Sequence, residues 1–220
     1  FRIIKVDEAN YPVLTRIVAA GQDYTHREVF LAQHLVLEAT EIANALSPAE
    51  IFLRWTGWRQ RWDEPPRWFE NADLVDVSNL PPTAQTALPA RTWETLTNDA
   101  GHAAQLLDGS KARECRLGVD PACEGYLLGL IRESSALLDA TDAWRTEFTT
   151  CLQPMDTLKS FTWAAVRIKS PVDTATLRFG NFLDLTNPDI LPLAPESEAA
   201  QLARYGHIPY APQPEPVAAL

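Results

Sequence analysis

The densest group of side chains able to do chemistry lies between Asp23 and Arg27, where the sequence reads Asp-Tyr-Thr-His-Arg, and a further histidine follows at position 34. In a pocket, Arg27 could clamp an anion while His34 or Asp23 moves a proton. Tyr24 and the later Asp99 complete this set of candidate site residues. The favoured interpretation is structural: a loop in which the aspartate and threonine cap a helix and Arg27 pairs with Asp23.

The histidines and serines of the chain do not form a recognisable reactive motif. His26 and His34 stand eight residues apart, and a metal site would need His102 from a third, distant segment to join them. No serine has the Gly-x-Ser-x-Gly context of a nucleophile elbow, and no phosphate-binding loop is present. The sequence therefore predicts no metal, no cofactor and no catalytic residue.

Three cysteines, an odd number, stand at positions 115, 123 and 151. Cys115 and Cys123 have neither a zinc-ligand spacing nor a histidine beside them, so we expect free thiols in a cytoplasmic protein. Arg113 and Arg116 could lower the pKa of Cys115, but a cysteine nucleophile would still need a histidine from elsewhere.

Tryptophans alternate with arginines between positions 54 and 68. Aromatic rings between arginines can stack on single-stranded bases, and both residue types are enriched at protein–protein hot spots. Asp63 and Glu64 interrupt the run and the net charge is −10, so nucleic acid is the least favoured partner. A solvent-facing patch with tryptophans packed under arginine stems ranks first, ahead of a protein interface. The candidate partner surface is Trp55, Trp58, Arg59, Arg61, Trp62, Arg67 and Trp68.

Two stretches near the start are typical of a β-hairpin. Residues 1–6 and 12–20 are rich in β-branched side chains, and Asp7–Asn10 between them is turn-like. Thr25 and Glu28 have the spacing of a capping box, which predicts a short helix over 29–32. Residues 34–37 fit either an extension of that helix or a buried strand, and we favour the strand.

Further elements follow from capping residues and hydrophobic periodicity. Ser47, Pro48 and Glu50 predict a helix that stops near Gly57. Residues 58–89 are turn-rich, with one possible strand at Leu74–Val77. We also expect helices at 92–96, 99–107 and 124–138, an antiparallel strand pair at 146–152 and 161–168, and one more strand within 176–185.

The chain is therefore expected to be an α+β protein with a mixed or mainly antiparallel sheet and several packed helices. Its 220 residues, 46% hydrophobic and 22% charged, suit a single domain, which we place at 1–208 with upstream residues missing. Prolines at every second position from 212 to 216 predict a linker over 209–220 that leads to further regions. No apolar run is long enough to span a membrane.

Several segments, in order, resemble the N-terminal domain of GTPase-associated proteins from bacterial conflict (defence-like) systems. They are residues 14–27, 30–37, 98–102, 144–150 and 182–185, with Ala203 and Arg204. The chain departs from the family pattern at three positions: His26 stands where glycine is usual, Gln33 replaces the first of two histidines, and His102 replaces a tryptophan. Gln33 thereby removes a neighbour with which His34 could have worked.

The resemblance implies a component that partners a GTPase and other conflict-system subunits, and it transfers no catalytic residue. The leading hypothesis is a non-enzymatic protein-interaction or adaptor domain in a bacterial GTPase-linked complex. The alternative is an uncharacterised enzyme or small-ligand-binding domain that uses Asp23, Tyr24, Arg27 and His34.

Overall fold

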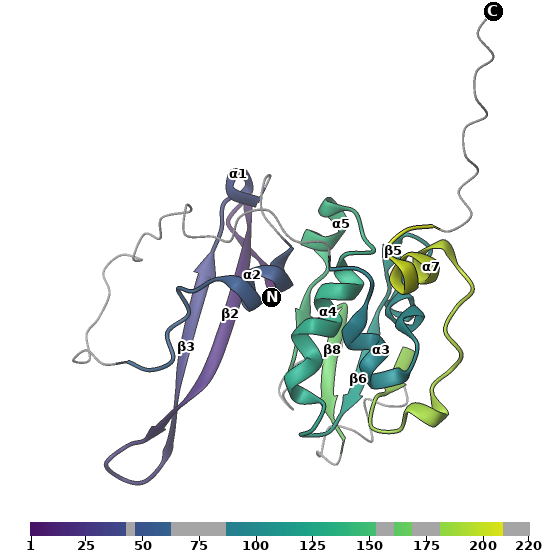
Figure 1. Cartoon of the computed structure of the whole chain (residues 1–220). Helices are drawn as coiled ribbons and strands as arrows, with labels where there is room; N and C mark the ends of the chain where they lie inside the picture. The colour runs from purple at the N-terminus through teal and green to yellow at the C-terminus, as the bar shows by residue number, and fades with distance from the viewer. Residues whose placement is uncertain (43–46, 63–86, 153–160, 169–180, 209–220) are drawn as a thin grey trace, which may run out of the picture.

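A computed structural model describes residues 1–42, 47–62, 87–152, 161–168 and 181–208. Within them, an antiparallel sheet near the N-terminus stands beside a parallel sheet that carries most of the helices (Figure 1). Helix α2 lies between the two parts and contacts both strand β2 and helix α4. The expected α+β class is confirmed. The strand considered at 74–77 and the linker at 209–220 lie outside the described residues.

The antiparallel sheet has the order β1-β2-β3, formed by Arg2–Val6, Ala9–Gln22 and Glu28–Val36. The predicted hairpin is confirmed, because β1 and β2 pair from Arg2↔Val13 to Val6↔Ala9. The strand favoured at 34–37 is confirmed as the end of β3. Beyond Val13, β2 continues without β1 and forms a long arm with β3 (Figure 1).

The helix predicted over 29–32 is wrong, because those residues belong to β3. Asp23 accepts hydrogen bonds from the backbone nitrogens of Thr25 (2.7 Å) and Arg27 (3.1 Å), so the hydroxyl and carboxylate pattern stabilises a turn and not a helix start. His26 adopts a positive φ of 61° in that turn. The ladder with β2 then satisfies the backbone groups of residues 28–36.

Helix α2 spans Pro48–Arg54, and its predicted start is confirmed. The Ser47 hydroxyl accepts a hydrogen bond from the Glu50 nitrogen at 3.4 Å, and Pro48 occupies the first turn, where no backbone N–H is needed. The helix ends at Arg54, three residues before the expected glycine. A short helix, α1, spans Ala39–Ile42.

The second sheet has the order β7-β8-β6-β9, and all neighbouring strands are parallel. Its strands are β6 (Cys115–Val119), β7 (Phe148–Thr149), β8 (Trp163–Arg167) and β9 (Asn181–Asp184). The strand expected within 176–185 is therefore confirmed, but antiparallel pairing between 146–152 and 161–168 is wrong. Side-chain alternation indicates which face is buried and says nothing about strand direction. All of β6 and four residues of β8 are buried, as is usual in parallel sheets.

The helices predicted at 92–96, 99–107 and 124–138 are confirmed. The second of them is a 3₁₀ helix, and the third begins with a 3₁₀ turn. Asp99 caps the second member of the pair by accepting from the Gly101 nitrogen at 2.8 Å. The remaining elements are α3 (Arg91–Thr97), η2 (Ala100–Leu106), β4 (Leu107–Asp108), β5 (Lys111–Ala112), η3 (Glu124–Tyr126), α4 (Leu127–Ser135), α5 (Ala140–Arg145), η5 (Pro188–Ile190) and α7 (Glu198–Tyr205).

One hydrophobic core joins the two sheets. Leu14 and Leu35 of the antiparallel sheet belong to the same buried cluster as Trp93, Leu117 and Trp163 of the helical part. In the described part of the chain, no helix has the length and apolar character needed to cross a membrane.

Glu133 of α4 supplies a cap that α3 lacks at its own N-terminus. Ala90 precedes α3 and offers no side-chain cap. The Glu133 carboxylate, only 2% exposed, accepts from the backbone nitrogens of Thr92 (2.9 Å) and Trp93 (3.1 Å) and from the Thr92 hydroxyl (2.7 Å). A negative group at this point also complements the positive end of the helix dipole.

We expect Glu133→Gln to lower the free energy of unfolding by about 2 kcal/mol, because the amide nitrogen would face backbone donors in a buried site. Urea denaturation measures the change. Glu94→Gln is the matched control: Glu94 pairs with Arg91 at the surface, so its replacement should cost no more than about 0.5 kcal/mol. Equal effects of the two substitutions would contradict the capping role.

Candidate functional site

Asp23, Tyr24 and Arg27 lie together at the turn that joins β2 to β3. The Thr25 hydroxyl donates a hydrogen bond to the Asp23 carboxylate at 2.6 Å. This bond has the largest effect on the pKa of Asp23, and together with the backbone hydrogen bonds it lowers that pKa. Arg27 reaches Asp23 through its backbone nitrogen. Tyr24 is 96% exposed. The cluster is thus a hydrogen-bonded turn at an exposed tip and has no enclosed space for a substrate.

His34 and Asp99 lie away from this turn. The Nδ1 atom of His34 is 2.8 Å from the Thr15 hydroxyl, across the ladder between β3 and β2. His34 lies seven positions after Arg27 along extended chain, roughly 23 Å away at the usual rise per residue. Asp99 begins η2, and its carboxylate binds the Nε and Nη2 atoms of Arg204, each at 2.8 Å. The structure therefore divides the five candidates among three places.

The two tryptophans at the start of the Trp/Arg run are core residues. Trp55 is 6% and Trp58 9% exposed, and the Trp58 ring stacks on Phe52 with centroids 5.4 Å apart. They are therefore unavailable as a partner surface, because the chain that follows α2 packs both side chains in the interior. Arg59 lies over the Trp62 ring at 5.0 Å, as the predicted packing of arginine on tryptophan requires. Arg67 and Trp68 lie outside the described residues.

The segment after α2 covers one face of the hairpin arm. Gln33 donates to the Gly57 carbonyl at 3.2 Å and accepts from the Arg59 nitrogen at 2.8 Å. The Arg16 guanidinium donates to the Arg59 carbonyl and to the Gln60 side chain, each at 3.0 Å. This face, which also carries buried Leu14 and Leu35, is the inner face of the antiparallel sheet.

The opposite, outer face of the antiparallel sheet is apolar and exposed, and the sequence analysis missed it. Large side chains there are 44–62% exposed: Ile4, Val6, Ile17, Phe30 and Val36. The strand register places these side chains on the same face of the sheet as Tyr11, Val13 and His34. Ile4, Val6, Tyr11, Val13, His34 and Val36 line an open hollow of about 440 Å³. Neighbouring apolar pairs such as Ile3-Ile4 and Phe30-Leu31 were the available signal, since both faces of the strands are apolar.

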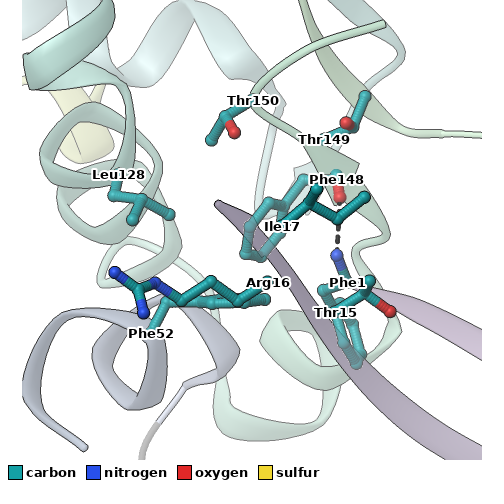
Figure 2. Close-up of a pocket in the computed structure, with 9 residues that line it drawn as sticks. All are labelled: Phe1, Thr15, Arg16, Ile17, Phe52, Leu128, Phe148, Thr149 and Thr150. Atoms are coloured by element: carbon teal, nitrogen blue, oxygen red, sulfur yellow. Dashed lines mark hydrogen bonds between the residues drawn. The ribbon is translucent and has the colours of Figure 1, made fainter. Parts of the chain in front are cut away.

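A smaller cleft lies where the arm meets the helical part (Figure 2). Its volume is about 250 Å³, and we call it the strand cleft. Thr15–Ile17 of β2 form one wall and Phe148–Thr150 the other, while Phe52 of α2 and Leu128 of α4 contribute apolar side chains. It contains none of the five predicted polar candidates.

Among the described residues, no three histidine, cysteine or acidic side chains gather in a way that could hold a metal ion. Cys115 and Cys123 are free thiols, as expected. Burial raises the pKa of Cys115 to about 12, so the neighbouring arginines do not activate this thiol.

Residues 1–74 match the family model of the GTPase-associated protein 1 N-terminal domain, type 2. The match covers about a third of the chain, a stretch that includes β1, β2, β3 and α2, and it confirms the resemblance drawn from the sequence. Neither a curated protein nor a solved structure matches the chain.

Asp99 and Arg204 should make folding stability depend on pH. Hydrogen bonding to Arg204 lowers the pKa of Asp99 to about 2, whereas an unfolded aspartate titrates near 4. The stabilisation is therefore complete above about pH 4 and is lost as the pH falls towards 2. Because the pair is partly exposed, we expect Asp99→Asn to cost about 1–2 kcal/mol at pH 6. Urea unfolding of the unmodified protein and of Asp99→Asn between pH 2 and 6 measures this cost. If the difference in their free energies of unfolding did not change with pH, the proposed role of the ion pair would be contradicted.

Iodoacetamide should distinguish the three cysteines in the folded protein. Cys151 is exposed and should react, whereas Cys115 is fully buried and should not. Mass spectrometry of the labelled, digested protein measures both, with urea-unfolded protein as the control in which all three react. Labelling of native Cys115 at a rate similar to Cys151 would show that its thiol is accessible.

Proposed function

We propose that this chain, whose first 74 residues match a GTPase-associated protein N-terminal domain, is a non-enzymatic interaction domain of a bacterial GTPase-linked conflict complex. In this proposal it acts as an adaptor, and the outer face of the antiparallel sheet binds the GTPase or another subunit. The free thiols fit a cytoplasmic complex.

The observation that carries the proposal is the exposed apolar outer face. Ile17 and Phe30 are each 62% exposed and Val36 is 54% exposed, and the pairing of β2 with β3 places all three on the same face of the sheet. Extended apolar patches of this kind are uncommon on soluble monomers unless they bind another protein. Burial of apolar area against a partner would yield about 25 cal/mol per Å².

The position of the face suits a docking surface. Inner-face residues such as Leu14 and Leu35 anchor the sheet to the core, so the outer face is presented on a supported platform. The arm that β2 and β3 form beyond Val13 projects past β1 (Figure 1). We retain Arg59, Arg61 and Trp62, on the inner side, as a second proposed contact surface.

Other functions receive less support from the geometry. The separation of Asp23, His34 and Asp99 gives no acid–base pair, which disfavours the enzyme alternative. The net charge of −10 disfavours a nucleic-acid partner.

The test is binding to the GTPase encoded beside this gene, measured by isothermal titration calorimetry. The double variant Ile17→Ser, Phe30→Ser should weaken binding at least about tenfold, because each removed side chain contributes to apolar burial on binding. Both residues are exposed, so the melting temperature should change little.

Leu193→Ser is the matched control, since Leu193 is 94% exposed and lies near the C-terminal helix, far along the chain from the outer face. Its affinity should equal that of the unmodified protein. Equal binding by the double variant, or no binding of a neighbouring GTPase by the unmodified protein, would refute the proposal.

A further inference from the structure

We propose that the free edge of β3 pairs with the β3 edge of a second copy of this chain, so that two antiparallel sheets become one continuous sheet in a homodimer. This edge lies on the far side of β2 from both β1 and the parallel sheet (Figure 1). The proposal does not rest on the adaptor function, because the pairing uses backbone groups at the edge and leaves the outer face uncovered.

The backbone groups that point away from β2 belong to the even-numbered residues of β3. Leu37 donates to the Pro12 carbonyl at 3.0 Å, in register with the ladder between β2 and β3. Because the hydrogen-bonding direction alternates along an antiparallel strand, the odd-numbered residues of β3 bond to β2. The outward-facing residues are therefore Phe30, Ala32, His34 and Val36. In the described part of the chain, their backbone N–H and C=O groups have no hydrogen-bond partner.

β3 lacks the features that usually protect an edge strand from pairing. Protected edge strands are commonly short, or they carry lysine, proline or a bulge. β3 has nine residues, and its ladder with β2 is regular from Val36 back to Phe30. Residues 29–36 include no charged residue and no proline, although 22% of the chain is charged. A long, regular and uncharged edge is a template for another strand, so we expect a strand to cover it in solution.

The register of the pairing favours a second copy as that strand. Two β3 strands related by a two-fold axis run antiparallel, and each presents the same outward groups to the other. With the axis at Ala32, Phe30 lies opposite His34 of the partner subunit, which adds packing between two rings across the strands. Glu28 then lies opposite Val36 of the partner subunit. Each hydrogen-bonded pair in this ladder exchanges two backbone hydrogen bonds.

Neighbouring registers bring unfavourable contacts. An axis at Gln33 sets Glu28 opposite Glu38 of the partner subunit, and like charges directly opposite are destabilising. An axis at His34 sets the two imidazoles opposite each other. The axis at Ala32 avoids both contacts and places a small side chain at the symmetry axis.

The rest of the molecule leaves room for the second copy. β1 and the parallel sheet lie on the other side of β2, so the two helical parts stand at opposite ends of the joined sheet (Figure 1). The segment after α2 bonds to the side chains of Gln33 and Arg16 on the inner face and not to the outward backbone groups of β3.

Sedimentation equilibrium of the unmodified chain between about 5 µM and 1 mM measures the association. We expect the mass to rise from that of one chain towards that of two, with a Kd below about 100 µM. Amide hydrogen exchange followed by NMR at about 20 µM and 1 mM identifies the surface. The amides of Phe30, Ala32 and His34 should exchange at least threefold more slowly at the higher concentration. Those of Leu31 and Gln33, already bonded to β2, should not change.

Three variants test the edge. Ala32→Pro removes an outward N–H and no donor to β2, and it should weaken dimerisation at least tenfold. Ala32→Thr is the matched control, because it keeps the N–H and suits a strand, and its Kd should stay within threefold. Ile17→Ser changes an outer-face side chain of β2 that is 62% exposed and should leave the Kd unchanged. Circular dichroism checks that each variant folds.

Three results would overturn the proposal. The first is a mass of one chain at 1 mM, whether the edge stays empty or receives a strand of another protein. The second is slow exchange of Ala32 at both concentrations in a monomer, which would show that the chain itself covers the edge. The third is a dimer weakened by Ile17→Ser and not by Ala32→Pro, which would use the outer face instead. Dimerisation requires no GTPase, so either proposal can fail while the other holds.

Discussion

The arrangement of this protein depends on how the antiparallel sheet is attached to the parallel one. Phe1 and Phe148 exchange two backbone hydrogen bonds, and the Ile3 nitrogen donates to Glu147 at 3.1 Å. Aromatic rings surround this bridge: Phe1 packs edge-on against Trp144, and Phe52 against Phe148, with centroids 5.8 and 5.9 Å apart. Such pairs contribute about 1 kcal/mol each beyond their buried area. The bridge anchors only the first part of the antiparallel sheet, which leaves the arm beyond Val13 projecting from the body.

That attachment determines which surfaces remain for other molecules. With the inner face packed on α2 and the core, the outer face retains its apolar side chains in solvent. The outer face belongs to the stretch matched by the family model.

Several charged groups of the described residues have structural roles. Glu133 caps α3, Asp99 caps η2 and binds Arg204, and Asp23 shapes the hairpin turn. Arg116, 2% exposed within β6, donates to the carbonyls of Cys115 and Phe161, each at 3.2 Å, and to the Glu114 carboxylate at 2.8 Å. Charged groups that are used in this way contribute to folding, and hydrogen bonds to Thr25 and Arg204 lower the pKa of Asp23 and of Asp99, respectively.

The sequence by itself determined the local elements whose signals are covalent neighbours: the Ser47-Pro48 helix start, the hairpin of β1 and β2, the Asp99 cap and the resemblance to the family. It misassigned residues 29–32, because Thr25 and Glu28 have the spacing of a helix cap, whereas in the structure Thr25 bonds to Asp23 in a turn and Glu28 pairs with Gln22 in the β2–β3 ladder. Strand direction in the second sheet, the burial of Trp58, and the Glu133 cap across 40 residues were decided by tertiary structure. So were the outer face and the strand cleft, because both depend on which strands and helices meet, and periodicity within one segment carries no information about the neighbour it will pack against.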